Sequence, residues 1–315
     1  MTCLSDKILY LCGKIPQPMR KMSFIVILCC LASMASAQLL YKISGNGLSQ
    51  PSYIVGTYHL APISMIDSIQ GLHDALASCQ QVYGELDMPI DDSMSNEVMV
   101  KMAAAMRMPG NETLRGLLDE QHYHGIDSLL TSLTGMGLAM IDMAHLSPAA
   151  VYTMLEGFIT LQLFPNYDPD AQMDNYFHQY AKSKGLPSKG LETVDDQIAV
   201  LYHGNSLERQ AQLLTCLYDH LDFEKTMIRD LVNAYFMQDL VRMEAAMDMK
   251  TNTICDSTPE EEDKLVYQRN QHWMAQMSTI MEEKPTFFAV GAAHLIGEKG
   301  LLQMLRQEGY TVEGV

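Results

Sequence analysis

The spacing of apolar and polar residues near the start of the mature chain predicts a β-hairpin followed by a strand–helix–strand unit. Residues 39–44 are strand-like, Ser44-Gly45-Asn46-Gly47 is a turn sequence, and 53–59 is extended again. Residues 66–79 then place Ile66, Ile69, Leu72 and Leu76 at helical spacing, and 81–88 returns to an extended pattern. This order predicts a βαβ unit whose two strands form a parallel pair.

The middle of the chain is helical in pattern. Residues from about 91 to 168 are rich in methionine and are interrupted by Gly and Pro, which predicts a helical insertion whose role the pattern does not indicate. After it, we expect helices at 173–183, 195–201 with Asp195 as its cap, 206–220, 222–249 and 259–283.

Strand patterns cluster at the two ends of the chain. We expect a short strand at 188–192, an interior strand at 286–290, a helix at 297–309 and a last strand at 310–315. The terminal strand–helix–strand unit must pair with the opening strands to complete a sheet. The fold class is therefore α/β, with one discontinuous core whose mixed or parallel sheet is built from N- and C-terminal strands. Since no linker is evident, 38–315 is predicted to be one domain.

The first 37 residues have the pattern of a secretory signal peptide. Met19-Arg20-Lys21-Met22 is basic, 23–34 is nearly all apolar, and Ala35-Ser36-Ala37 places small residues before a cleavage site at Gln38. We expect translation to start at Met19 or Met22, export to the periplasm or the outside of a bacterium, and no stable membrane span after cleavage. Left uncleaved, the segment would anchor the chain in a membrane instead.

Composition and charge limit the classes of molecule that the chain is expected to bind. The chain has 315 residues, 48% of them apolar and 19% charged, and its formal net charge is −17. A surface this acidic repels phosphate backbones, so nucleic acid is not an expected partner. Three of its seven cysteines (Cys79, Cys216 and Cys255) lie after the signal segment, without a CxxC motif. Two of them could form a disulfide, but these cysteines do not form a disulfide framework or a cysteine metal cluster.

The chain repeats one pattern at its two ends. Tyr53 to His59 and Phe287 to His294 are each an apolar strand that ends in Gly-x-x-His. The carboxyl ends of strands in an open α/β sheet are where ligands bind, and glycine there permits a sharp turn. If the strands were neighbours, two imidazoles would lie close together, and with a carboxylate they form a common ligand set for a divalent transition metal.

Three further polar residues are candidates for the same edge. Glu85 ends the strand at 81–88 and is a candidate ligand or general base, with Asp87 as the alternative on the same face. Glu192 also ends a strand, although a helix cap formed by Thr193 or Asp195 would explain that polar cluster equally well. Arg269 could stabilise an oxyanion, whereas an exposed helix face is the ordinary environment for it. No HExxH, GxSxG, P-loop or strand-linked GxGxxG is present.

Five short motifs follow one another along the chain: Val55-Gly56-Thr57-Tyr58-His59, Tyr83-Gly84-Glu85-Leu86-Asp87, Gly190-Leu191-Glu192-Thr193 with Gln197, Arg269-Asn270, and Val290-Gly291-Ala292-Ala293-His294. In this order and spacing, and over about 40–315, the chain resembles the TraB/PrgY/GumN family. That family is similar to the Tiki proteins, membrane-tethered metalloproteases with paired Gly-x-x-His motifs and a glutamate. The methionine-rich segment departs from the pattern, so substrate selection does not transfer.

The resemblance implies a metal-dependent hydrolase that acts on peptides. It makes His59, His294 and Glu85 the metal ligands, with a divalent Mn, Co or Zn ion. Glu85 is also a catalytic candidate, Arg269 a supporting one, and Glu192 matches a motif without a defined role. Two alternatives remain: a non-catalytic module that binds a peptide or haem in the same pocket, and a purely structural envelope protein.

Overall fold

Six strands form a single mixed sheet in the order β4-β3-β5-β2-β1-β6. The computed structural model describes residues 38–87, 92–139, 143–165 and 172–315, so the predicted signal segment 1–37 lies outside the described residues. The strands are β1 (Leu40–Gly45), β2 (Ser52–Thr57), β3 (Gln81–Leu86), β4 (Ser188–Glu192), β5 (Thr286–Gly291) and β6 (Tyr310–Gly314). β1 is antiparallel to β2 and β6, whereas the pairs β2–β5, β5–β3 and β3–β4 are parallel. The α/β class and a mixed sheet built from both ends of the chain are confirmed.

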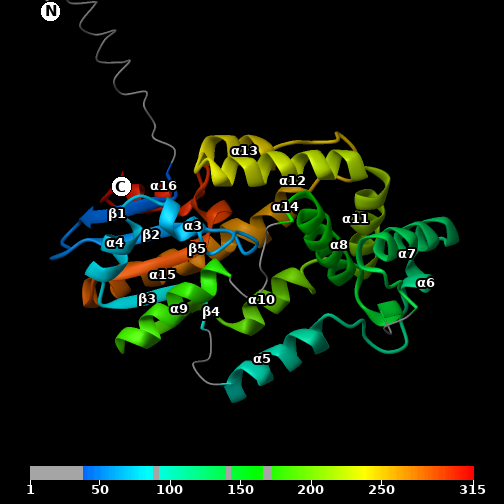
Figure 1. Cartoon of the computed structure of the whole chain (residues 1–315), viewed down its shortest axis with the longest axis horizontal. Coiled ribbons are helices and arrows are strands. Elements are labelled where there is room, and N and C mark those ends of the chain that lie inside the picture. Colours follow the sequence, from blue (N-terminus) through cyan, green and yellow to red (C-terminus); the bar gives the residue numbers. More distant parts are fainter. Residues whose placement is uncertain (1–37, 88–91, 140–142, 166–171) are drawn as a thin grey trace, which may run out of the picture. The chain divides into compact units, whose positions relative to one another are not determined.

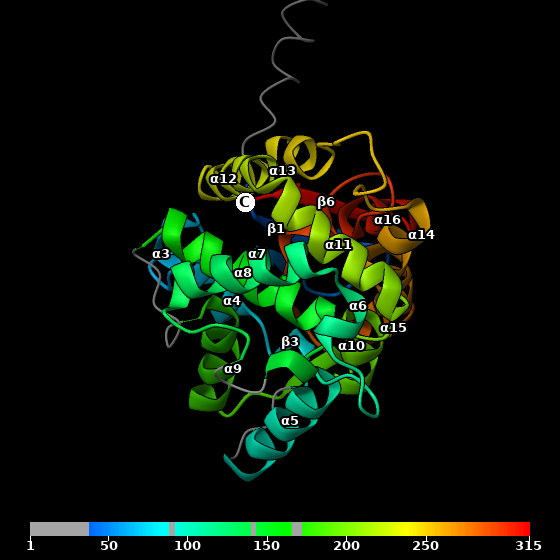
Figure 2. The ribbon, with the colours of Figure 1, turned by 90° about the vertical axis from the view of Figure 1, so that its right-hand side faces the viewer.

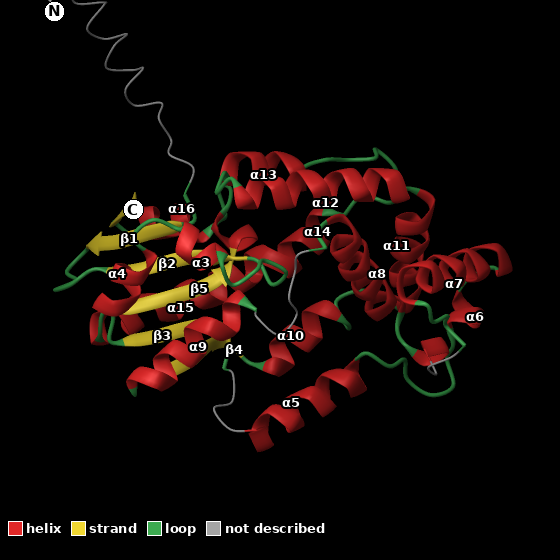
Figure 3. Ribbon diagram, viewed as in Figure 1, coloured by secondary structure: helices red, strands yellow, loops and turns green. Residues whose placement is uncertain are grey.

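Helices cover both faces of this sheet (Figure 3). Side chains alternate between the faces along β5, so that Phe287 and Ala289 pack on one side and Phe288 and Val290 on the other. The first side packs against α4 (Leu72–Ser78), α9 (Met173–Lys184), α12 (Leu221–Phe236) and α13 (Leu240–Met247). The second packs against α15 (Gln268–Glu283) and α16 (Leu301–Gln307).

The predicted helical middle consists of short and long helices with an apolar cluster of their own. Its elements are α5 (Asp92–Ala105), α6 (Leu114–Leu117), α7 (Glu120–Thr134), a 3-10 turn (Met143–His145) and α8 (Pro148–Leu163). α7 and α8 pack with α11 (Leu207–Asp219) through fully buried Ile126, Leu130, Leu155 and Leu214. Figures 1 and 2 show these three helices beside one another from two directions.

The predicted pairing of the first two parallel strands is wrong. β2 and β3 are parallel to each other, but β5 lies between them and pairs with both. Four consecutive residues of β5, from Phe287 to Val290, are buried and apolar. A strand that is apolar on both faces gains most from a position where both faces are covered. A strand from the C-terminal region therefore takes the central position.

Several predicted helices are subdivided. The helix expected at 66–79 is interrupted at Gly71, whose φ of +73° begins a new helix, so it becomes α3 (Met65–Ser68) and α4. The helix expected at 222–249 is likewise two helices, α12 and α13. Of the two caps considered for the helix at 195–201, Asp195 is wrong and Thr193 is confirmed: Thr193 caps α10 (Val194–Leu201) through a reciprocal capping box with Asp196.

The helix expected at 259–283 contains a change of helix type. It begins as α14 (Pro259–Glu262), continues as a π-helix (Asp263–Tyr267) and ends as α15. The helix expected at 297–309 is the shorter α16. Cys216 on α11 forms a disulfide with Cys255 in the loop before α14, and Cys79 is a buried free thiol. None of the helices in the described ranges combines the length and the apolar character needed to cross a bilayer.

Candidate functional site

The two Gly-x-x-His segments leave the sheet side by side. β2 and β5 are neighbouring parallel strands, and Thr57 stands opposite Gly291 at their carboxyl ends. His59 follows β2, and His294 lies in the 3-10 turn Ala292–Leu295 that follows β5. A side chain on Gly56 would come within 3.0 Å of the Ala292 and Leu295 side chains, so the glycine lets the two segments approach each other.

The guanidinium of Arg269 organises the charged residues of this edge. It donates to both carboxylate oxygens of Glu192, from Nε at 2.9 Å and from Nη2 at 2.7 Å. Nη2 also donates to Glu85 at 2.7 Å, and Nη1 lies 2.9 Å from Nε2 of His294. The Glu192 side chain is 2% exposed and that of Arg269 is 12% exposed. Arg269 is thus part of a buried ion-pair network and does not lie on an exposed helix face.

Glu85 receives donors on both of its oxygens. The backbone N–H of Gly291 donates to Oε1 at 2.7 Å, and Oε2 accepts from Arg269 and, at 3.4 Å, from Gln197. A side chain on Gly291 would lie 3.0 Å from Oε1, so this glycine makes room for the carboxylate. Burial raises the pKa of Glu85, while electrostatic interactions with His294, Arg269 and His59 and the hydrogen bond from the Gly291 N–H lower it, and the net shift is downward. Glu85 is therefore an ionised acceptor.

His294 is held in one tautomer. Asn270 donates from its amide nitrogen to the carbonyls of His294 and Lys299, so its amide oxygen is the atom that faces Nδ1 of His294 at 2.7 Å. Nδ1 therefore carries the proton and Nε2 carries the lone pair that Arg269 meets. Burial lowers the pKa of His294 to about 4, so the imidazole is neutral at neutral pH. Trp273 packs on its ring at 4.3 Å between centroids and donates to Glu192 at 3.2 Å.

His59 is oriented by a different residue. Its Nδ1 lies 2.6 Å from a carboxylate oxygen of Asp174, which belongs to α9. This hydrogen bond raises the pKa of His59, an effect weakened by solvent because the side chain is 64% exposed. The charge of His59 also contributes to lowering the pKa values of Glu85 and His294. His59 is thus electrostatically coupled to the network.

The structure therefore brings Glu85, Glu192, Arg269 and His294 into one hydrogen-bonded network, with His59 coupled to its edge. Sequence reasoning named these five residues but missed their supporting partners, Asp174, Asn270, Trp273 and Gln197, as functional residues. Asn270 and Gln197 stand beside the candidates within the recognised motifs, and that adjacency was the available signal. Trp273 offered another, because it lies four residues after Arg269 and so on the same side of α15.

The donor set has the chemistry of a transition-metal site. His59 and His294 each bond a side chain through Nδ1, the arrangement by which proteins usually orient a metal-binding imidazole, and Glu85 supplies a carboxylate. Within the described ranges, however, no three His, Cys, Asp or Glu side chains are spaced to hold a metal ion. The donors are of the types that bind a divalent ion. Two of them, His294 and Glu85, are in contact with the Arg269 guanidinium.

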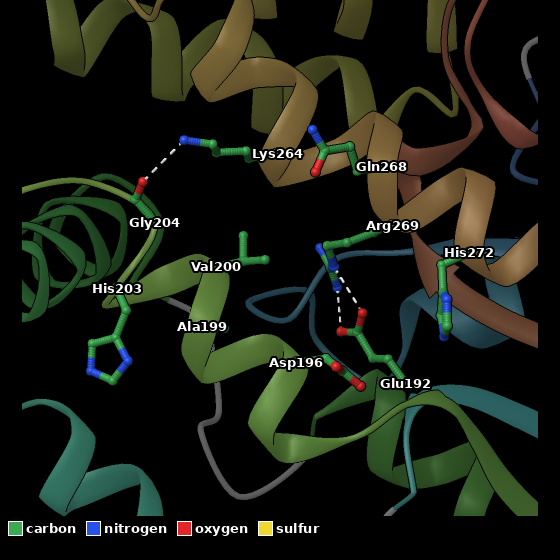
Figure 4. A pocket seen from close by; sticks show the side chains of 10 residues that line it. All are labelled: Glu192, Asp196, Ala199, Val200, His203, Gly204, Lys264, Gln268, Arg269 and His272. Carbon is green, nitrogen blue, oxygen red and sulfur yellow. Dashed lines mark hydrogen bonds and ion pairs between the residues drawn. The ribbon is translucent and has the colours of Figure 1, made fainter.

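A pocket of about 440 Å³ is lined in part by the Arg269–Glu192 pair (Figure 4). One wall is α10 with Asp196, Ala199 and Val200, and the opposite wall is the π-helix and the start of α15 with Lys264 and Gln268. The ion pair is thus shared between this pocket and the network with Glu85 and His294.

Comparison with known proteins identifies one family and relatives that are named metalloproteases. Residues 39–314 match the model of the TraB/PrgY/gumN family. The chain is 23% identical over 310 residues to "Metalloprotease TIKI2" of Danio rerio, covering 84% of this chain and 58% of that protein. It is 24% identical over 314 residues to "Metalloprotease TIKI homolog" of Nematostella vectensis, covering 84% and 65%. The chain therefore spans roughly three fifths of the length of these relatives. No solved structure matches it.

Proposed function

The chain belongs to the TraB/PrgY/gumN family, and from that premise we propose that it is a metal-dependent hydrolase that cleaves peptide bonds. The observation that carries the proposal is the buried network of Glu85, Arg269 and His294 at the carboxyl ends of parallel strands. The names of the relatives, which are metalloproteases, support it.

His59, His294 and Glu85 would hold the metal, through Nε2 of each imidazole and the carboxylate. Asn270 and Asp174 already orient the two imidazoles from their Nδ1 side. A divalent Mn, Co or Zn ion bound there would supply Lewis-acid activation of water and of a carbonyl group.

The residues of the chain supply the proton transfer and the charge stabilisation. Glu85 is ionised and can accept a proton from the attacking water, which is the task of a general base. The Arg269 guanidinium carries a permanent positive charge, which Glu192 holds at this edge of the sheet, and it can stabilise the oxyanion that develops on a peptide carbonyl. Glu192 holds Arg269 by two hydrogen bonds and so sets the direction of that charge.

A peptide-library experiment tests this function. The purified chain is stripped of metal, supplied with Mn²⁺, Co²⁺ or Zn²⁺, and incubated with mixed peptides whose products are identified by mass spectrometry. We expect cleavage that requires metal and is lost in His59→Ala and His294→Ala. His124→Ala is a matched control for His59, because both imidazoles are 64% exposed and His124 lies in α7. Cleavage that persists without metal or in both site variants would contradict the proposal.

A ligand-binding module is the second candidate. It is favoured by one observation, the direct contacts of Arg269 with Glu85 and His294, which occupy two of the proposed metal donors. In that case the chain retains a peptide or haem without turnover, and absorbance near the haem Soret band tests the haem directly.

Export is part of the proposal. The basic, apolar and small-residue segments of 1–37 support cleavage before Gln38 and release to the periplasm or the outside of a bacterium. N-terminal sequencing of the native protein is expected to begin at Gln38. A protein that keeps Met19 or Met22 as its first residue would refute cleavage.

A further inference from the structure

We propose that Arg269 is a two-position residue that competes with the metal: an inner position in which it bonds Glu85 and His294, and an outer position in the pocket beside α10 that it takes when a divalent cation binds. This inference rests on the proposed function, because it concerns the same donors. It adds a residue that controls when the site can bind a cation.

The competition follows from the atoms that Arg269 uses. Its Nη1 meets Nε2 of His294, the nitrogen that Asn270 leaves with a lone pair. Its Nη2 bonds Oε2 of Glu85 at 2.7 Å. A lone pair that accepts a hydrogen bond from a guanidinium cannot also bind a cation, and two positive charges cannot share one carboxylate at short range without repulsion. Cation binding at His294 and Glu85 therefore requires Arg269 to move away from both.

The structure provides a place for the displaced guanidinium. Arg269 itself lines the pocket of about 440 Å³, together with Glu192, Asp196 and Gln268 (Figure 4). Glu192 lines the same pocket and already bonds Arg269 twice, so it can stay paired with Arg269 in both positions. At the cap of α10, the Asp196 carboxylate accepts the backbone N–H and the hydroxyl of Thr193 through Oδ2, and its other oxygen, Oδ1, can accept from the arriving guanidinium.

The backbone around Arg269 suits a side chain with two positions. It lies two residues after the π-helix Asp263–Tyr267, and its Nη1 donates to the carbonyl of Leu265 at 3.1 Å. π-helical turns occur often at functional sites. Arg269 lies near the end of this one and contacts both the inner network and the pocket.

Trp273 is a built-in reporter of the position of Arg269. It is the one tryptophan of the chain. Its ring lies 4.8 Å from the Arg269 guanidinium carbon and 4.3 Å from the His294 ring, and it is fully buried. Movement of the cation away from the indole face removes a cation–π contact, so tryptophan emission should change as the site binds a cation.

The test is a titration of the full metal-free chain with Zn²⁺, followed by tryptophan emission and, independently, by equilibrium dialysis. Zn²⁺ has no redox chemistry that would complicate the signal. We expect a saturable change of emission in the natural protein.

The Arg269→Met/Glu192→Gln double variant removes the competing guanidinium without leaving Glu192 as an unpaired charge. This variant should bind Zn²⁺ about tenfold more tightly or better, since two charge-assisted hydrogen bonds no longer oppose binding. Asp196→Asn should weaken Zn²⁺ binding about threefold or more, because the outer position loses its second carboxylate.

Asp195→Asn is the matched control for Asp196→Asn. It removes the same charge one residue earlier on α10, but Asp195 pairs with Lys101 and does not line the pocket. Its affinity for Zn²⁺ should equal that of the natural protein. Equal affinity in the natural protein and the Arg269→Met/Glu192→Gln variant would overturn the two-position inference while leaving a metal site in place. Absence of saturable Zn²⁺ binding in every variant, by both readouts, would overturn the metal-dependent function as well.

Discussion

Replacement of Arg269 by methionine should be among the most destabilising single changes at this site. The substitution keeps much of the length of the side chain but removes its charge and five hydrogen bonds, two of them to Glu192 and one each to Glu85, His294 and the Leu265 carbonyl. The Glu192 carboxylate is 2% exposed and that of Glu85 is 11% exposed, so water cannot replace the lost donors. Breaking a buried ion pair from one side costs about 3–5 kcal/mol, and we expect a loss of that size.

Urea unfolding in the presence of EDTA, followed by circular dichroism, measures this cost. An unchanged slope with a midpoint lower by about 1 M or more would correspond to the expected loss. Glu192→Gln combined with Arg269→Met should recover part of it, because residue 192 is then uncharged and Glu85 keeps the Gly291 N–H and Gln197 as donors.

The control for this measurement is an exposed ion pair. Lys101 and Asp195 lie 2.6 Å apart, but their side chains are 47% and 70% exposed. Lys101→Met should therefore cost less than about 1 kcal/mol. The reasoning is refuted if Arg269→Met costs no more than Lys101→Met, or if the double variant is no more stable than Arg269→Met alone.

Three further outcomes are expected. Asn270→Ala should lower hydrolysis more than ligand retention and should lower the free energy of unfolding by about 2–4 kcal/mol, because the fully buried amide bonds His294 and two carbonyls. A variant with full activity and stability would contradict the role assigned to Asn270. Cys255→Ser should cost about 2–4 kcal/mol by opening a disulfide that spans 39 positions, and calorimetry should show that added reductant lowers the melting temperature of the natural protein but not of the variant. Burial, together with the neighbouring carboxylate of Glu156, raises the pKa of Glu224 to about 7. The folded state then holds a proton that the unfolded chain releases above a pKa of about 4.3, so stability should fall as pH rises between these values and Glu224→Gln should flatten that fall in melting temperature; an unchanged slope would exclude Glu224 as its source.

The parts of the fold that follow from local pattern could be read from the sequence. The apolar runs at 53–59 and 286–290 predicted strands, and Gly-x-x-His after both predicted that they finish in the same way. The prediction that these strands are neighbours is confirmed by the parallel pairing of β2 with β5. The position of β5 between β2 and β3 could not be read in this way, because strand order depends on which strand needs cover on both faces.

The candidate site, too, has a part that the sequence indicated and a part that only packing decided. The residue types and their order along the chain indicated Glu85, Glu192, Arg269 and the two histidines. Whether Arg269 is an exposed helix residue or a buried partner was open, because the sequence around it is polar. The packing of α15 on the second face of the sheet, where Arg269 meets Glu85 and Glu192, decided that it is buried.

By itself, the sequence determined the α/β class, the strands at both ends and the identity of the chemically capable residues, because periodicity and motif are properties of neighbouring positions. Only the tertiary structure decided that Arg269 bonds Glu85, 184 positions away, and Glu192, 77 positions away. The same holds for the disulfide between Cys216 and Cys255 and for Asp174 as the partner of His59. The physical reason is that a buried charge requires a partner, but chain order does not specify which residue packing will bring within reach.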